Sequence, residues 1–183
     1  MTAEANYKTG LYNTDKRIIL SMNINGSIYY TTNSTTPTNN SKKYTGPFII
    51  SSTSTLKFIT IKNSKKSPVY TERYNIDKIS PKVTITNPKN GAKGFSKTAT
   101  ISIKFSENIK TSSKWSNIYI KNLNTAKKVG ISKSIKNNIL NIKMTKKRFG
   151  YNTYQVYIPA GAVKDNAGNN IATTTSFKFK TCK

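Results

Sequence analysis

Side chains able to carry out acid–base or nucleophilic chemistry are scarce in this chain of 183 residues. Histidine, the commonest general base and the usual activator of a nucleophile, is absent. The carboxylates are scattered, so only proximity in the fold could make a glycosidase pair of any two. They are Glu4, Asp15, Glu72, Asp77, Glu107 and Asp165. The sequence therefore predicts a protein that is not an enzyme and needs no cofactor.

Two of these acids allow an alternative interpretation. Asp165, with Asn166 and Asn169, could offer oxygen ligands to a calcium ion. Because Asp and Asn are also ordinary turn formers, and one carboxylate in a basic region holds a cation poorly, we expect a turn and no metal site. Glu107 could join an Asn–Lys–Glu isopeptide crosslink of the kind found in some surface sandwiches. A surface ion pair with a neighbouring lysine is the favoured interpretation.

The densest group of cationic and aromatic side chains lies between residues 143 and 151. It comprises Lys143, Lys146, Lys147, Arg148, Phe149 and Tyr151. Cations attract an anionic glycan and an aromatic ring can lie against a sugar face, so we predict that these residues bind a ligand. The alternative is a solvated hairpin loop whose lysines prevent aggregation at a sheet edge. A weaker second candidate is formed by Tyr29, Tyr30 and Tyr44, which tyrosine packing could also explain.

The charge of the whole chain favours an anionic partner. Lys and Arg number 31 against 6 Asp and Glu, a net charge of +25. Up to Lys78 there are 11 basic and 4 acidic residues, a net +7, and the remainder carries 20 and 2, a net +18. Such an excess attracts polyanions and is weakened by salt. Only Arg17, Arg73 and Arg148 are arginines, so we expect no specific nucleic-acid partner.

The sequence contains few candidate residues for covalent modification or crosslinking. Asn25, Asn33 and Asn39 each begin an Asn-x-Ser/Thr sequon in turn or loop sequence, and are candidate glycosylation sites on a secreted protein. Cys182 is the single cysteine, which excludes an intrachain disulfide and a cysteine metal cluster. Stability must therefore come from packing.

The elements that position these residues are predicted to be β-strands. In the first half they are residues 17–22, 27–31, 47–51, 55–62 and 69–76, with 33–41 an exposed loop. The Asn25-Gly26 pair predicts a hairpin between the first two strands. Leu56, Phe58 and Thr60 should share one face of their strand.

The second half has the clearer alternation. Expected strands are 82–87, 98–106, 117–122, 128–134, 139–144, 153–158 and 176–180. Residues 159–170 form the longest interruption, with room for a short helical turn. Tyr154 occupies the position of a corner tyrosine in an immunoglobulin-like sandwich. With apolar residues at only 35%, two thin cores are expected rather than one large core.

The predicted fold class is therefore all-β, with two tandem immunoglobulin-like β-sandwiches. We place the first in residues 1–78 and the second in residues 79–183, because strands stop near 77–81 and Pro81 can donate no ladder hydrogen bond.

Particular segments resemble known families. Residues 28–38 (IYYTTNSTTPT), 43–47 (KYTGP) and 67–70 (SPVY) resemble the chitobiase/β-hexosaminidase C-terminal type of module. That family usually carries Asp-Gly where this chain has Asn33-Ser34, so an acidic group of the loop is missing. Residues 86–92 (TNPKNGA), 103–107 (IKFSE) and 158–169 (IPAGAVKDNAGN) resemble the bacterial Ig-like domain of S-layer and surface proteins.

The pairing of these modules, with frequent Lys, Asn and Ile, is similar to repeats in adhesin-like proteins of methanogenic archaea. The resemblance implies a non-catalytic segment displayed outside the cell, on its surface, beside neighbouring Ig-like repeats. Implied partners are anionic glycans, a carboxylate-bearing wall polymer such as pseudomurein, or the surfaces of other cells. Two alternatives are a structural stalk and an accessory module of a carbohydrate-active enzyme. Neither a signal peptide nor a membrane span is found, so an excised segment of a longer protein is expected.

Overall fold

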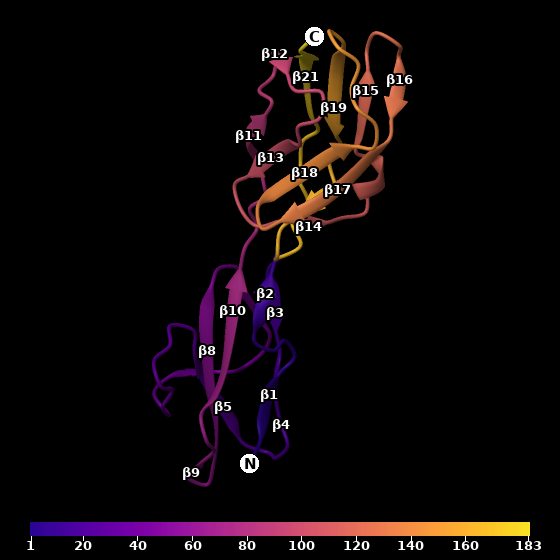
Figure 1. Ribbon diagram of the computed structural model, residues 1–183. Helices are drawn as coiled ribbons and strands as arrows, with labels where there is room; N and C mark the ends of the chain where they lie inside the picture. The colour runs from indigo at the N-terminus through magenta and orange to yellow at the C-terminus, as the bar shows by residue number, and fades with distance from the viewer. The chain divides into compact units, whose positions relative to one another are not determined.

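The computed structural model describes residues 1–183, and its regular elements are β-strands apart from one short 3-10 turn (Figure 1). The chain divides into two compact units, Met1–Lys78 (unit 1) and Ile79–Lys183 (unit 2). Each unit has its own core of buried apolar side chains. The predicted fold class, all-β with two Ig-like domains, is confirmed. No helix is long and apolar enough to cross a membrane.

Unit 1 contains ten short strands. They are β1 (Ala3–Ala5), β2 (Gly10–Tyr12), β3 (Lys16–Ile18), β4 (Leu20–Met22), β5 (Ser27–Thr31), β6 (Lys42–Lys43), β7 (Phe48–Ile50), β8 (Ser54–Lys62), β9 (Lys65–Lys66) and β10 (Tyr70–Ile76). The main sheet has the order β2-β10-β8-β5-β6, with β9 paired to β8. The pairs β1-β4 and β3-β7 form separate short ladders.

The predicted hairpin at Asn25-Gly26 is wrong. Strand β4 pairs with β1, whereas β5 pairs with β8 and β6, so the turn carries the chain from one ladder to another. A Cβ on Gly26 would lie 2.8 Å from the carbonyl oxygen of Ile61 on β8. Glycine is needed here because two backbones approach closely, not because a hairpin turn requires positive φ.

The core of unit 1 is formed by alternating residues of its longer strands. Leu56, Phe58 and Thr60 are buried together, as the alternation predicts. Tyr74 is fully buried, and its hydroxyl donates a hydrogen bond of 2.7 Å to the carbonyl of Tyr7. Burial raises the pKa of the Tyr74 phenol far above its usual range, so this hydroxyl remains a donor at all physiological pH values.

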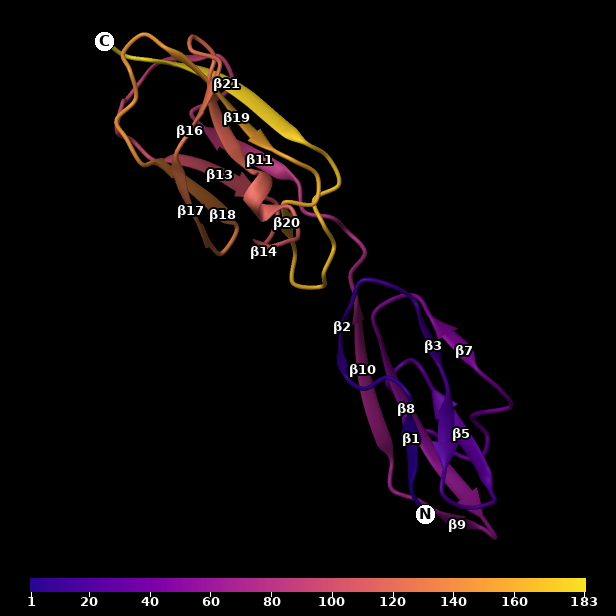
Figure 2. The ribbon, with the colours of Figure 1, turned by 90° about the vertical axis from the view of Figure 1, so that its right-hand side faces the viewer.

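Unit 2 contains eleven strands and one short 3-10 turn. They are β11 (Val83–Asn87), β12 (Ala92–Phe95), β13 (Ile101–Phe105), β14 (Lys110–Thr111), η1 (Trp115–Asn117), β15 (Tyr119–Asn122), β16 (Lys127–Val129), β17 (Ile131–Lys136), β18 (Ile139–Met144), β19 (Thr153–Ile158), β20 (Val163–Lys164) and β21 (Thr175–Thr181). One sheet has the order β11-β13-β18-β17 and the other β12-β21-β19-β15-β16. Figure 2 shows β17 and β18 on the opposite side of the unit from β19 and β21.

Two expectations for unit 2 are corrected. The single strand expected at 128–134 is two strands, because Gly130 separates β16 of one sheet from β17 of the other. The helical turn expected within 159–170 is absent. That segment instead contains β20, which pairs with β14, and the 3-10 turn lies at Trp115–Asn117. Both errors concern segments of two or three residues, too short for periodicity to resolve.

The core of unit 2 fills the space between its two sheets. Ile101, Ile103 and Phe105 of β13 face Val156 and Ile158 of β19 within one continuous buried cluster. Tyr154 is 1% exposed, and its hydroxyl accepts a 2.9 Å hydrogen bond from the backbone N–H of Phe149. This bond to a backbone group a few residues upstream matches the geometry of a tyrosine corner.

Candidate ligand-binding site

The basic segment predicted to bind a ligand runs from the end of β18 into the connection to β19. The structure divides its side chains among three environments. Lys143 is exposed and pairs in register with Ser132, on the outer face of the four-stranded sheet. Lys146, Lys147 and Phe149 are exposed on the connection. Arg148 lies in the interior.

The burial of Arg148 corrects its predicted exposure to a ligand. It is 3% exposed, and its two terminal nitrogens donate 2.9 Å hydrogen bonds to the carbonyls of Ser96 and Ala99. Its guanidinium carbon also lies 5.2 Å and 5.7 Å from the ring centres of Phe95 and Phe179. Burial lowers the pKa of Arg148 from its usual value, and the nearby Tyr154 opposes that change. The residue therefore fastens the segment before β13 to the connection before β19.

The exposed part of the segment borders a hollow of about 470 Å³. Its lining combines apolar and cationic side chains with Gly130, the point at which the chain passes from β16 in one sheet to β17 in the other (the sheet switch). The lining residues are Lys128, Val129, Gly130, Met144, Thr145, Lys146, Lys147, Phe149 and Tyr154. A hollow of this size fits a small ligand or part of a polymer. A smaller hollow of about 150 Å³, bordered by Lys97 and Thr98, lies on the Arg148 side of the same connection.

The sheet switch at Gly130 forms one wall of the larger hollow. Thr145 donates a backbone hydrogen bond of 3.0 Å to the carbonyl of Gly130, which holds the end of β18 beside the switch. A Cβ at Gly130 would collide with the Thr145 hydroxyl, so glycine permits this approach. The hollow thus lies where the chain passes from one sheet to the other.

The charged side chains that line the hollow are all lysines, and no carboxylate of unit 2 lies among them. The only acids of unit 2, Glu107 and Asp165, do not line the hollow. Phe149 is 67% exposed and offers a ring beside Lys146 and Lys147. An anionic group could therefore contact ammonium groups while an apolar surface packed on the ring.

Sequence reasoning missed Lys128, Val129 and Met144 as members of this site. They come from β16 and the end of β18, and β16 reaches the segment only through the fold. The signal that could have found them is Gly130, a glycine within an otherwise continuous strand pattern, which often marks a close backbone approach. Tyr151 is 58% exposed in the same connection, has a φ of 56°, and does not line the hollow.

Two of the three tyrosines considered as a second candidate site, Tyr30 and Tyr44, pack against neighbouring rings, whereas Tyr29 is half-buried on β5 and pairs in register with Lys43. Tyr30 is 5% exposed and stacks on Phe48 at a centroid separation of 4.4 Å, and Tyr44 meets both rings edge-on. A hollow of about 280 Å³ beside them is lined by Tyr30, Thr31, Thr32, Asn33, Ser41 and Lys42. The sequon residues Asn25, Asn33 and Asn39 are all exposed.

Asp165 organises a turn. It is 1% exposed, and one oxygen accepts hydrogen bonds from the backbone N–H groups of Gly168 and Asn169, at 2.6 Å and 2.8 Å. The other oxygen accepts a 2.7 Å bond from the side-chain amide of Asn169. Three donors thus engage this carboxylate, as expected for a buried Asx turn.

Two all-β units, each with its own buried core, and in unit 2 two sheets packed face to face, define a pair of immunoglobulin-like modules. The chain belongs to the bacterial Ig-like domain family, which it matches over residues 77–181. Residues 7–71 match the chitobiase/beta-hexosaminidase C-terminal domain. Both are non-catalytic module types, and Ig-like domains of this family are typical of cell-surface proteins. No curated protein matches the sequence.

Solved structures of similar fold share little sequence with this chain. The N-terminal part of the bacterial S-layer protein SbsC has 17% identity and a TM-score of 0.43, over 57% of this chain and 24% of that one. The chain thus spans about a quarter of that structure. A chimeric titin Z1Z2 has 5% identity and a TM-score of 0.37, covering 98% and 95% of the two chains. Rst D1-D2 has 7% identity and a TM-score of 0.46, covering 100% and 99%.

Proposed function

We propose that this chain is a non-catalytic segment of an extracellular, adhesin-like surface protein, and that unit 2 binds anionic glycans. The observation that carries the proposal is the hollow between β16 and the β18–β19 connection. Its apolar floor, exposed phenylalanine and lysine rim match the two chemical faces of a carboxylated sugar. The strong positive charge of unit 2 would raise the local concentration of such a ligand.

The similarity to adhesin-like repeats of methanogenic archaea points to a wall polymer as ligand. Pseudomurein carries carboxylates, so lysines could retain the module on its own wall or attach it to the surface of another cell. Neighbouring Ig-like repeats of a longer protein would then be its partners along the chain. The match of residues 7–71 to a module found in carbohydrate-active enzymes supports an accessory role as an alternative.

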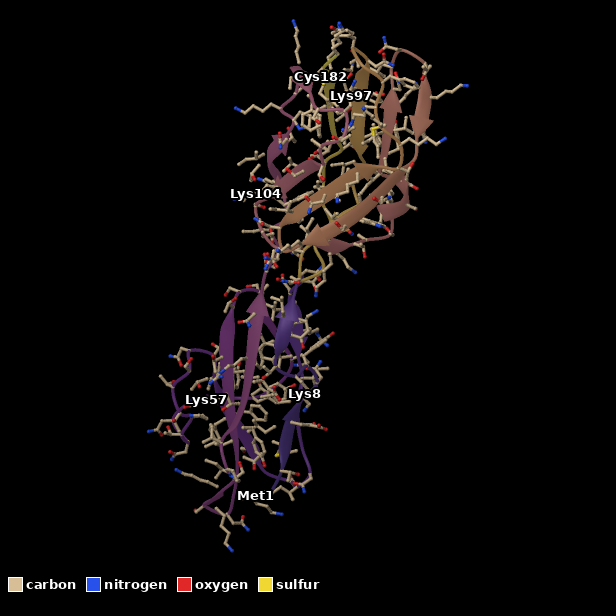
Figure 3. All side chains as sticks on the ribbon, in the orientation of Figure 1. Met1, Lys8, Lys57, Lys97, Lys104 and Cys182 are labelled. Carbon is tan, nitrogen blue, oxygen red and sulfur yellow. The ribbon has the colours of Figure 1, made fainter.

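A structural stalk is the other alternative, and the distribution of lysines favours it in part. Exposed lysines also occur away from the hollow, as Lys8 of unit 1 and Lys104 of unit 2 illustrate (Figure 3). A stalk would use this dispersed charge for solubility and would show no preference for one patch.

The deciding experiment compares two double variants of the full chain. Lys146→Gln with Lys147→Gln removes two charges at the hollow, and Lys104→Gln with Lys136→Gln removes two exposed charges on the four-stranded sheet. Isothermal titration with polygalacturonate should show the first variant weakened about fivefold and the control almost unchanged, because two lost ion pairs are each worth about 0.5 kcal/mol. Equal binding by both variants would support the stalk.

A further inference from the structure

The outer face of the five-stranded sheet in unit 2 carries a row of polar side chains, three of them lysines, across four neighbouring strands. Lys128 of β16 stands opposite Lys121 of β15, Lys121 opposite Gln155 of β19, and Gln155 opposite Lys178 of β21. Directly opposed residues of antiparallel strands point to the same side of the sheet. These four residues, the lysine row, therefore cross the sheet perpendicular to its strands.

The spacing of the lysine row is set by the sheet. Neighbouring strands lie about 4.8 Å apart, so three steps from Lys128 to Lys178 span roughly 14 Å. Lys180, two residues beyond Lys178 on β21, is exposed on the same face and is counted below as part of the lysine row. The charges thus form a line long enough to contact several units of an extended polymer.

Nothing within these strands compensates the row. The only acids of unit 2, Glu107 and Asp165, lie outside β15, β16, β19 and β21. Like charges directly opposite one another destabilise a sheet, so the Lys121–Lys128 pair costs folding free energy. A bound polyanion would remove that repulsion.

A tyrosine pair lies beside the lysine row. Tyr119 and Tyr157 stack with ring centres 4.8 Å apart and planes 19° apart, and the Lys128 ammonium lies 4.2 Å from the Tyr119 centre. The two rings face each other and a lysine lies over Tyr119. The pair therefore presents its hydroxyl groups to a ligand more readily than its ring faces. Hydroxyls suit hydrogen bonding to sugars, whereas single-stranded nucleic acid requires exposed rings on which bases stack.

Both ends of the lysine row meet hollows. Lys128 also lines the 470 Å³ hollow described above. At the other end, a hollow of about 210 Å³ is lined by Gly91, Ala92, Lys93, Thr153, Lys178, Phe179 and Lys180. One end of the row therefore adjoins the larger hollow and the other end adjoins the smaller one.

We propose that the ligand is a linear acidic polysaccharide that extends from the larger hollow across the lysine row toward β21. This inference rests on the proposed function and specifies the form of the ligand: an extended chain with repeated carboxylates, not a short oligosaccharide. Binding gains affinity with chain length until the row is covered. Lys121, Lys178 and Lys180 are separate from Lys146 and Lys147, because none of these three lines the larger hollow.

The test uses the full chain with Lys121→Gln, Lys178→Gln and Lys180→Gln, the row variant. The matched control carries Lys82→Gln, Lys104→Gln and Lys136→Gln, three exposed lysines near the other sheet. The ligands are long polygalacturonate, trigalacturonate and single-stranded DNA, titrated at one ionic strength. The row variant should bind long polygalacturonate about tenfold more weakly than the control, because it loses three ion pairs of about 0.5 kcal/mol each.

Trigalacturonate should bind both triple variants alike, because it occupies the hollow alone. Equal binding of the long polymer by the row variant and the control would overturn the inference. In that case the proposed function would still stand if the double variant Lys146→Gln with Lys147→Gln bound the polymer more weakly. If the double variant also bound normally, the proposed function and this inference would both fail. Tighter binding of DNA than of polygalacturonate would overturn the choice of ligand.

A second measurement on the unmodified protein does not depend on any variant. Long polygalacturonate should shift the backbone amide NMR signals of β15, β19 and β21 and the ring signals of Tyr119 and Tyr157. Shifts confined to β13 and β18 would contradict the inference.

Discussion

Within the 143–151 segment, neighbouring side chains have opposite environments. Lys147 is exposed and Arg148 is buried between two phenylalanine rings. Clustering of charge in the sequence could predict Lys146, Lys147 and Phe149 as surface groups. It could not predict the direction of Arg148, because the carbonyls that hold it belong to Ser96 and Ala99, 52 and 49 residues away.

Arg148→Met should destabilise unit 2 by about 2–4 kcal/mol, since it leaves the carbonyls of Ser96 and Ala99 without their charged donor and removes a buried guanidinium from its contacts with Phe95 and Phe179. Arg148→Lys should recover only part of the loss, because one ammonium cannot reproduce the two-pronged contact. Lys147→Met is the matched control and should change the free energy of unfolding by less than about 0.5 kcal/mol. Urea unfolding measures all three. An unchanged Arg148→Met variant would mean that the guanidinium is exposed.

Lys143→Gln should leave binding to polygalacturonate unchanged apart from the small general effect of one charge. The reason is its position on the outer face of the four-stranded sheet, opposite Ser132, away from the hollow lining. Lys147→Gln should weaken the same binding about twofold. Titration calorimetry of the two single variants measures both affinities. A larger loss of affinity at Lys143 than at Lys147 would mean that Lys143 contacts the ligand, as predicted from the clustering of charge in the sequence.

At the scale of elements, strict alternation located the long strands well. The expected strands at 139–144 and 153–158 agree with β18 and β19 residue for residue. Two failures occur where the chain changes sheets, at Asn25-Gly26 and at Gly130. Two others are the single strand expected at 17–22, which is β3 and β4 of different ladders, and the helical turn expected within 159–170. Each of these two glycines lies close to a residue distant in the sequence, Ile61 for Gly26 and Thr145 for Gly130. The local pattern of residues does not predict which distant residue that is. The hollow was missed for the same reason.

Gly26→Ala tests the close approach in unit 1. The added methyl group would lie 2.8 Å from a backbone carbonyl of β8, so unit 1 should lose about 1–3 kcal/mol. Gly46→Ala is the control, because a methyl group added there would have no atom within 4 Å and the φ of Gly46 is not positive. That change should be neutral or slightly stabilising. Thermal unfolding of unit 1 in which both variants behave alike would refute the proposed role of Gly26.

Ile103→Asp tests whether the two units fold independently. Ile103 is fully buried in the unit 2 core, so an unpaired carboxylate there should unfold unit 2. We propose a domain boundary at residues 78 and 79, and therefore expect the NMR signals of unit 1 to keep their folded positions. Simultaneous loss of the signals of both units would argue for a single cooperative domain.

At the scale of the whole molecule, the distribution of charge separates the roles proposed for the two units. Unit 2 carries a net charge of +18 from 20 basic and 2 acidic residues, against +7 for unit 1. Attraction of a polyanion by such a charge falls with added salt, since the screening length shortens from about 10 Å at 0.1 M to about 3 Å at 1 M. Charge, unlike the position of the hollow, could be inferred fully from the sequence.

Binding of the unmodified protein to carboxylated and uncharged glycans on one array, at low and high salt, tests the central claim most directly. The account predicts retention of long carboxylated chains at low salt, strong loss of that retention at high salt, and no retention of uncharged chains of equal length. Equal retention of charged and uncharged glycans, or no retention of either at low salt, would contradict it.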